Sequence, residues 1–257
     1  MGKIMNVKYD LTKYEDVKAI IKKALLSDKL FCISTVNLEF VMLAQRNKEF
    51  KDYLNNISDL NTVDGVGILN VLSWYNITNS ERVCGSDLVY TLAELCEILN
   101  KKYYILGAAT DVSNNAKIKL KTLYPNLQIE NYSPPFTKEL NFSEKEDNKI
   151  KQQILAFKPD VLCVAFGAPK QELWIKNHYD FLLQNGVKIA IGLGGSFDFV
   201  SGKVKRAPDL FKKTGNEWLY RLITEPKLRF KRQISTIPLF YILAFFEFLR
   251  NKIKWML

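Results

Sequence analysis

Up to about residue 200 the chain alternates short apolar runs with stretches of helical pattern, and this alternation restricts the fold more than any other feature. Several runs are rich in Val, Ile, Leu and Cys without polar alternation, which is typical of strands buried on both faces of a parallel sheet. The pattern predicts a doubly wound α/β sheet that binds its ligand at the carboxyl ends of the strands. The expected strands begin at Leu30, Ile57, Lys102, Leu127, Asp160 and Val187, and the expected helices begin near Leu38, Val66, Ser86, Asp111, Ser143 and Pro169. Ser86 and Asp111 are expected to provide the N-caps of their helices.

The sequence changes character after Gly202, where basic residues accumulate. From Ser201 to Leu257 there are 13 Lys or Arg and 4 Asp or Glu, so this segment carries +9 of the net charge of +10. We therefore expect two units, an α/β core over residues 1–202 and a basic, helical C-terminal appendage over residues 203–257. Such a basic surface suits a diphosphate ligand, an anionic membrane or a nucleic acid, and charge alone does not choose among them.

The appendage contains an apolar run, PLFYILAFFEFL, from Pro238 to Leu249. A transmembrane helix needs about 20 apolar residues, so this run of roughly a dozen is too short to span a bilayer. Flanking Lys and Arg side chains and Trp255 favour a helix that lies in the membrane interface. The alternative is an ordinary terminal helix that packs on the body of the protein or on a second subunit.

Composition and spacing argue against several kinds of site. The four cysteines, Cys32, Cys84, Cys96 and Cys163, are scattered, which does not fit a disulfide framework or a zinc site. The single histidine, His178, is interpreted as structural. The chain has no Asp-x-Asp pair, the usual carboxylate clamp for a divalent ion on a nucleotide sugar. We expect no cofactor and no metal, and the polar N-terminus, which lacks a signal-peptide core, predicts a cytoplasmic protein.

Polar residues follow two of the expected strands, at the edge where a ligand should bind. STVN ends the first strong strand with Thr35 and Asn37, which are placed either to bond a ligand or to cap the next helix. TVDG ends the next strand with Asp64, which is placed either as a general base or as another helix cap. The local pattern leaves both alternatives open.

Two glycine-containing segments follow later strands. In FGAPKQELW a buried strand runs into Gly167, and Lys170 and Gln171 lie in the first turn of the next helix, a combination that suits an anionic ligand. GLGGSFDFVSG contains Gly194 and Asp198 but lacks the G-x-G-x-x-G spacing of a dinucleotide site. Its glycines indicate a close backbone approach, and a plain tight turn is the alternative.

The basic appendage contributes arginine side chains, which form bidentate contacts with phosphate oxygens. The arginines expected to act in this way are Arg206, Arg221, Arg229 and Arg232. The alternative is a solvated run of charge.

The order of the motifs resembles that of the WecG/TagA/CpsF glycosyltransferases: TVN, TVDGVGI, ERVCGSDL, YYILG, SPPF, FGAPKQELW, GLGGSFDFVSGKVKRAPDLF and GNEWLYRLITEPKLRFKRQ. The resemblance runs from Leu30 to Gln233, with Val63 and Cys84 as departures inside familiar motifs. It implies a Rossmann-like, inverting, metal-independent enzyme. Such enzymes usually transfer N-acetylmannosamine from its UDP form to undecaprenyl-diphosphate-linked N-acetylglucosamine, in the synthesis of teichoic acid or other cell-surface polysaccharides.

The resemblance also implies roles for particular residues. The catalytic aspartate of the family falls on Asp64, and its conserved threonine and asparagine fall on Thr35 and Asn37. The appendage from Lys203 onward corresponds to a segment that supplies arginines to the site and touches the cytoplasmic face of the membrane. The residues expected to bind substrate are Arg82, Gly107, Gly167, Lys170, Gln171, Gly194, Asp198, Arg206, Arg221, Arg229 and Arg232.

In this interpretation the partners are a UDP-sugar, a polyprenyl-diphosphate-linked acceptor and an anionic membrane surface, and not a nucleic acid. Another donor, with N-acetylmannosaminuronic acid or glucose, for capsule or exopolysaccharide synthesis, is an alternative. A nucleic-acid-binding protein would use the basic tail but would leave the strand-end motifs unexplained. A non-catalytic nucleotide-sugar-binding subunit would have no need of Asp64. The sequence leaves open whether the chain forms a homo-oligomer.

Overall fold

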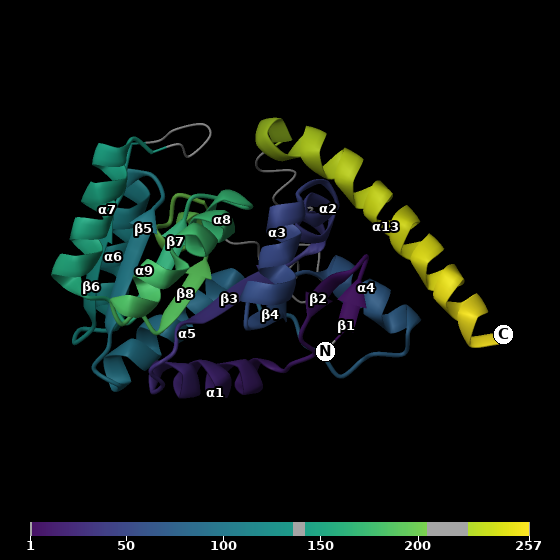
Figure 1. The fold of residues 1–257 in the computed structure, drawn as a ribbon, viewed down its shortest axis with the longest axis horizontal. Coiled ribbons are helices and arrows are strands. Elements are labelled where there is room, and N and C mark those ends of the chain that lie inside the picture. Colours follow the sequence, from purple (N-terminus) through teal and green to yellow (C-terminus); the bar gives the residue numbers. More distant parts are fainter. Residues whose placement is uncertain (1, 136–141, 205–225, 257) are drawn as a thin grey trace.

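The structure, a computed structural model, describes residues 2–135, 142–204 and 226–256, and for residues 226–234 and 254–256 it describes the backbone only. Its centre is a six-stranded parallel sheet in the order β4, β3, β8, β7, β5, β6 (Figure 1). The strands are β3 (Phe31–Val36), β4 (Leu60–Val63), β5 (Lys102–Gly107), β6 (Gln128–Tyr132), β7 (Val161–Ala165) and β8 (Ile189–Gly192). The six predicted strands and the doubly wound α/β fold are confirmed.

Helices cover both faces of the sheet and bury two separate cores, because successive strand residues point to opposite faces. On β7, for example, Leu162 and Val164 lie in one core and Cys163 lies in the other. The first core is covered by α2 (Leu38–Arg46), α3 (Lys48–Asp52), the π-helical turn η1 (Tyr53–Ile57), α4 (Val66–Trp74), α7 (Glu144–Phe157), α8 (Lys170–Asn177) and α9 (Tyr179–Gln184). The second is covered by α1 (Tyr14–Leu25), α5 (Gly85–Ile98), α6 (Thr110–Leu123) and α10 (Ser196–Val200).

The six predicted helices begin within one residue of their expected starts, but two of the expected caps are wrong. Cys84 and Ala109 occupy the N-cap positions of α5 and α6, and Ser86 and Asp111 lie inside the first turn.

Two elements near the N-terminus were not predicted: a hairpin of β1 (Gly2–Ile4) and β2 (Val7–Tyr9), and helix α1. The many charged residues of α1 make the helical spacing of its buried residues hard to recognise in the sequence. These buried residues are Val17, Ile21, Ala24 and Leu25.

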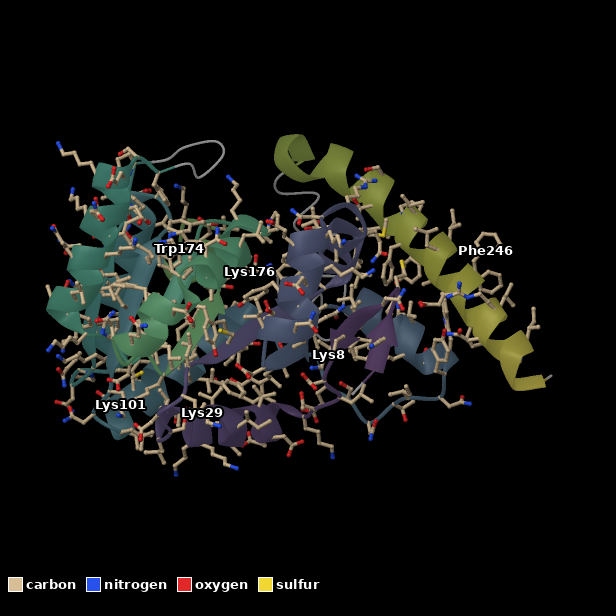
Figure 2. All side chains as sticks on the ribbon, viewed as in Figure 1. Lys8, Lys29, Lys101, Trp174, Lys176 and Phe246 are labelled. Carbon is tan, nitrogen blue, oxygen red and sulfur yellow. The ribbon has the colours of Figure 1, made fainter. Side chains whose placement is uncertain are left out.

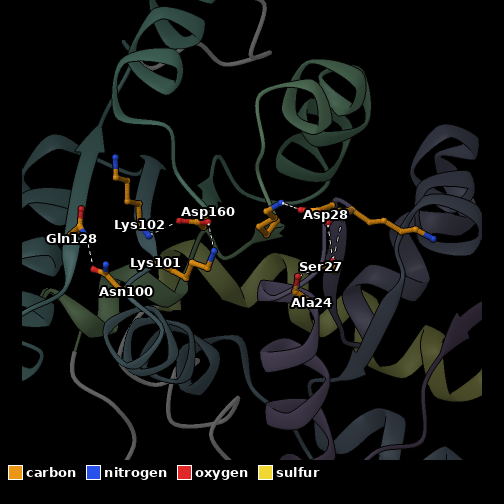
Figure 3. Close-up of polar contacts among 10 residues, drawn as sticks. Ala24, Ser27, Asp28, Asn100, Lys101, Lys102, Gln128 and Asp160 are labelled. Carbon is orange, nitrogen blue, oxygen red and sulfur yellow. Dashed lines mark hydrogen bonds and ion pairs between the residues drawn. The ribbon is translucent and has the colours of Figure 1, made fainter.

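Polar contacts tie the elements together at the amino end of the sheet (Figure 3). Asp160, just before β7, accepts a hydrogen bond of 2.9 Å from the Lys102 N–H at the start of β5, and its other oxygen lies 3.1 Å from the Lys101 ammonium. Lys188, just before β8, pairs with Asp28 at 2.9 Å. These contacts lie at the end of the sheet opposite the polar strand-end motifs.

The C-terminal helix α13 (Pro226–Met256) runs along one edge of the molecule and continues through Pro238 (Figure 1). One of its faces packs on the body, because Phe240 and Ala244 are fully buried and the helix contacts α2 and α4. The Phe248 ring lies 6.1 Å from the Trp74 ring of α4. The packed-helix alternative is therefore confirmed for this face.

The opposite face of α13 is apolar and exposed. Ile242, Phe246, Leu249 and Ile253 recur along it at helical spacing. Phe246 is 63% exposed and projects away from the body (Figure 2). No helix within the described ranges is both long and apolar enough to cross a membrane. The division of the chain into a core and an appendage stays a prediction.

Candidate active site

A cavity of about 620 Å³ opens at the carboxyl ends of β3, β4, β7 and β8, the edge where a parallel sheet is expected to bind its ligand. Strand-end loops, α2 and Thr236 of α13 form its wall together with residues of α5, α8 and α10. The wall includes six of the residues that the sequence singles out: Thr35, Asn37, Asp64, Gly167, Gln171 and Gly194.

Asp64 follows β4 directly and meets the first turn of α5. One carboxylate oxygen accepts a hydrogen bond of 3.3 Å from the N–H of Gly85, the first residue of that helix. The Asp64 N–H donates to the Val36 carbonyl at 2.8 Å, which ties the residue to the end of β3. The N-cap of the next helix, α4, is Gly65 and not Asp64. Asp64 therefore lines the cavity as an anchored carboxylate.

Thr35 and Asn37 stand beside Asp64 at the end of β3. The Asn37 side-chain oxygen accepts a hydrogen bond of 3.1 Å from the Phe40 N–H, so Asn37 caps α2 as well as lining the cavity. Thr35 is 7% exposed. A Cβ at Gly85 would lie 3.3 Å from its hydroxyl oxygen, which places the start of α5 close against Thr35. The helix-capping alternative is thus confirmed for Asn37, and its predicted catalytic role stays a prediction.

Gln171 joins two glycine loops across the cavity wall. Its side-chain oxygen accepts hydrogen bonds from the Gly167 N–H at 3.0 Å and from the Gly194 N–H at 3.1 Å. A Cβ at Gly194 would lie only 2.9 Å from that oxygen. The close approach indicated by the glycines is therefore an approach of two loops to one side chain. Substrate contacts by these three residues stay a prediction.

Arg82 and Gly107 do not line the cavity. The Arg82 Nε–H donates to the Cys84 sulfur at 2.8 Å, and Cys84 is a wall residue. Gly107 ends β5 with φ +99°, and a Cβ there would lie 2.8 Å from the Phe166 ring. The glycine therefore serves a tight packing contact between strand ends.

Two of the remaining expected binding residues do not line the described wall, and the side chains of the other four are not described. Lys170 begins α8 and Asp198 lies in α10, and neither lines the cavity. Arg206 and Arg221 lie outside the described residues, and Arg229 and Arg232 belong to the part of α13 whose side chains are not described. Their predicted contacts with substrate stay predictions.

Sequence reasoning missed the part of the wall that α2 provides. Glu39, Leu43 and Arg46 line the cavity at helical spacing after Asn37. Arg46 is the only basic side chain among the wall residues that the structure describes, and it is exposed. The signal was available, because a helix that starts at a ligand-binding strand end presents one of its faces to that ligand. The sequence of α2 by itself has the pattern of an ordinary amphipathic helix, whose polar face usually meets solvent.

The cavity wall, as far as the structure describes it, contains one thiol, Cys84, and no imidazole. Burial raises the pKa of the Cys84 thiol, and the neighbouring Asp64 raises it further, so this wall residue stays a neutral thiol. His178 accepts or donates hydrogen bonds at 2.9 Å to the Trp174 carbonyl and to Asp147, and its ring stacks on Trp174, which fits a structural residue. The described ranges contain no group of three or more His, Cys, Asp or Glu side chains that could hold a metal ion.

Comparison with known proteins identifies the family of this chain. The profile described as the "Glycosyl transferase WecG/TagA/CpsF family" matches residues 2–254. A protein of Bacillus subtilis (strain 168) is 34% identical over 236 residues, which cover 90% of this chain and 86% of the relative. A protein of Staphylococcus aureus (strain MRSA252) is 30% identical over 241 residues, which cover 92% and 89%. Both relatives bear the name N-acetylglucosaminyldiphosphoundecaprenol N-acetyl-β-D-mannosaminyltransferase.

The match covers the strand-end motifs, the cavity and α13 together, and it agrees with the parallel α/β sheet. The chain therefore belongs to the WecG/TagA/CpsF family of glycosyltransferases.

Proposed function

We propose that this protein transfers N-acetylmannosamine from UDP-N-acetylmannosamine to undecaprenyl-diphosphate-linked N-acetylglucosamine, with inversion at the anomeric carbon. The proposal rests chiefly on Asp64, an anchored carboxylate on the wall of a strand-end cavity in a chain of this family. The names of the relatives supply the donor sugar and the acceptor.

In the proposed reaction the Asp64 carboxylate takes the proton from an acceptor hydroxyl as that oxygen attacks the anomeric carbon. The new carbon–oxygen bond forms while the bond to the diphosphate oxygen breaks, and UDP leaves with the electron pair. General-base help of this kind is worth about 10²–10⁴-fold in rate. The negative charge that develops on UDP must be stabilised by hydrogen-bond donors or cations. We propose that the arginines of the appendage supply this positive charge.

We further propose that the exposed face of α13 lies in the anionic inner surface of the cytoplasmic membrane. The supporting observation is a row of exposed apolar side chains, among them Ile242, Phe246 and Ile253, on a helix that also carries Arg250 and Lys252. Thr236 lines the cavity, and Ile242 lies six residues further on, about 9 Å along the helix. A lipid-linked acceptor would then meet the cavity close to the membrane surface.

Turnover by the full-length protein tests the proposal. The purified protein is incubated with a short-chain lipid-diphosphate-N-acetylglucosamine acceptor and, in separate reactions, with UDP-N-acetylmannosamine, UDP-N-acetylmannosaminuronic acid, UDP-glucose and UDP-N-acetylglucosamine. We expect the highest kcat/KM with UDP-N-acetylmannosamine. Preference for another UDP-sugar would replace the donor and keep the reaction class. Failure to bind UDP or to turn over any of them would contradict the proposal.

A further inference from the structure

Glu172, the residue after Gln171, is a buried carboxyl that the proposed reaction does not use. It is 1% exposed, and burial raises the pKa of the carboxyl to about 7. One oxygen accepts a hydrogen bond of 2.7 Å from the Gln171 side-chain N–H, while the other has no hydrogen-bond partner among the described residues. A buried carboxyl with one unsatisfied oxygen is costly, so a carboxyl at this position calls for a reason other than stability.

The contacts of Gln171 supply that reason. The amide of Gln171 has two distinct ends: its oxygen receives the Gly167 and Gly194 N–H groups, and its nitrogen donates to Glu172. The side chain therefore forms a chain of hydrogen bonds that starts at Glu172 and ends on the two loops at the carboxyl ends of β7 and β8. Both loops contribute residues to the cavity wall.

Close packing leaves this arrangement little freedom. A Cβ at Gly192 would lie 2.5 Å from both the Gln171 amide nitrogen and the Glu172 oxygen, so the two side chains fill the space beside β8. If Glu172 offered no acceptor, the buried amide nitrogen would lose its partner, a loss that costs about 1–3 kcal/mol. The amide would then turn toward the cavity to find water, and its oxygen would leave the two loops.

We infer that Glu172 is a positioning residue, which holds the Gln171 amide and through it fixes the Gly167 and Gly194 loops in the geometry that binds the nucleotide of the donor. The ligand part of this inference rests on the proposed function. The positioning part does not, because the hydrogen bonds exist in the protein alone.

Two substitutions separate positioning from folding. Methionine is unbranched and similar in length to glutamate, so Glu172→Met keeps the core filled and removes only the hydrogen-bond acceptor. Glu172→Gln keeps an oxygen for the Gln171 N–H. Ile175→Ala, at a fully buried site on the same helix, serves as the matched control, because it weakens the core while the described hydrogen bonds of Gln171 remain.

The first measurement is hydrogen–deuterium exchange of the full-length, ligand-free protein. In Glu172→Met we expect the amides of residues 166–168 and 193–195 to exchange at least about tenfold faster, with the melting temperature unchanged or higher. Glu172→Gln should exchange as the wild type does. Ile175→Ala should lower the melting temperature without singling out these two loops. Wild-type exchange in both loops of Glu172→Met would overturn the inference.

The second measurement is the Kd for UDP by calorimetry. Glu172→Met should bind UDP about tenfold more weakly, whereas Glu172→Gln and folded Ile175→Ala should bind it as the wild type does. Wild-type affinity in Glu172→Met would overturn the ligand part of the inference. A wild-type protein that does not bind UDP would contradict the proposed function, and the exchange measurement would still decide whether Glu172 positions the loops.

Discussion

The Asp64 carboxylate accepts a hydrogen bond of 3.3 Å from the Gly85 N–H, so the end of β4 is joined to the start of α5 at the cavity wall. The start of α5 is also closely packed at Gly85, which has no side chain. A Cβ there would lie 3.0 Å from the Ser196 hydroxyl oxygen and 3.3 Å from that of Thr35, tighter than most real contacts. Asp64 of the TVDG motif and Gly85 of the ERVCGSDL motif, which are 21 residues apart in the sequence, are thus joined at the cavity wall.

The buried carboxyl of Glu172 makes stability depend on pH. Its pKa is about 7 in the folded protein and near 4.5 in the unfolded chain. Below pH 4.5 both states bind the proton and nothing is lost. As the pH rises to 7 only the unfolded chain ionises, so the free energy of unfolding falls, by about 3 kcal/mol in full. Above pH 7 the folded state ionises too, and this loss stays constant.

Thermal melts of Glu172→Gln and the wild type from pH 4 to pH 8 check this dependence. Because glutamine does not titrate, the melting temperature of the variant should rise relative to that of the wild type between pH 5 and pH 7. A difference between the two that stays flat across this range would show that the carboxyl is not buried in its neutral form.

Phe246 is expected to contribute to membrane binding through the exposed face of α13. Transfer of a Phe side chain out of water is worth about 1.5–3 kcal/mol, so Phe246→Ser should weaken binding to anionic liposomes roughly tenfold. Turnover of a water-soluble acceptor should stay unchanged. The control is Ile118→Ser on α6, where the side chain is 64% exposed, against 63% for Phe246. Equal loss of liposome binding in both variants, or in neither, would argue against α13 as the membrane surface.

Arg46 is expected to bind a diphosphate group of one substrate. A hydrogen bond to a charged group is worth about 1.5–3 kcal/mol, so Arg46→Gln should raise the KM of that substrate at least tenfold while kcat changes less. Separate titrations of the UDP-sugar and of the lipid-diphosphate acceptor identify the substrate concerned. Lys48→Gln, an exposed basic residue outside the cavity wall, is the control. Unchanged KM values for both substrates in Arg46→Gln would exclude the contact.

Divalent metal removal is expected to leave turnover unchanged. The chain has no Asp-x-Asp pair to hold a metal on the nucleotide diphosphate, and the proposed charge stabilisation comes from arginines. Turnover is measured after dialysis against EDTA and again after addition of magnesium or manganese. Loss in EDTA with recovery on metal addition would show that the diphosphate needs a metal.

The sheet could be predicted from the sequence because strands such as VLCVA over 161–165 are buried on both faces and carry continuous apolar runs. Helix α1 could not, because its four buried side chains are scattered among charges and only the packed structure shows which face they occupy.

Part of the candidate site could also be predicted from the sequence. Asp64 and Thr35 each follow or end a predicted strand, and parallel topology brings such ends to one edge. The hydrogen bonds that join Gln171 to Glu172 and to the Gly194 loop could not be predicted. They depend on the close approach of that loop, which is 23 residues from Gln171 in the sequence. The glycines indicated a close approach of the backbone at these positions, but the side chain that the backbone approaches could not be identified from the sequence.

Asp64→Asn tests the central claim most directly. Asparagine keeps the shape of the side chain and its oxygen for the Gly85 N–H but cannot take a proton. Full-length wild type, Asp64→Asn and the control Asp28→Asn, an exposed aspartate at the amino end of the sheet, are assayed with UDP-N-acetylmannosamine and the soluble acceptor, and their Kd for UDP is measured by calorimetry. The account predicts that Asp64→Asn loses about 10²-fold or more in kcat while it binds UDP as the wild type does. Near-wild-type turnover in Asp64→Asn would contradict it.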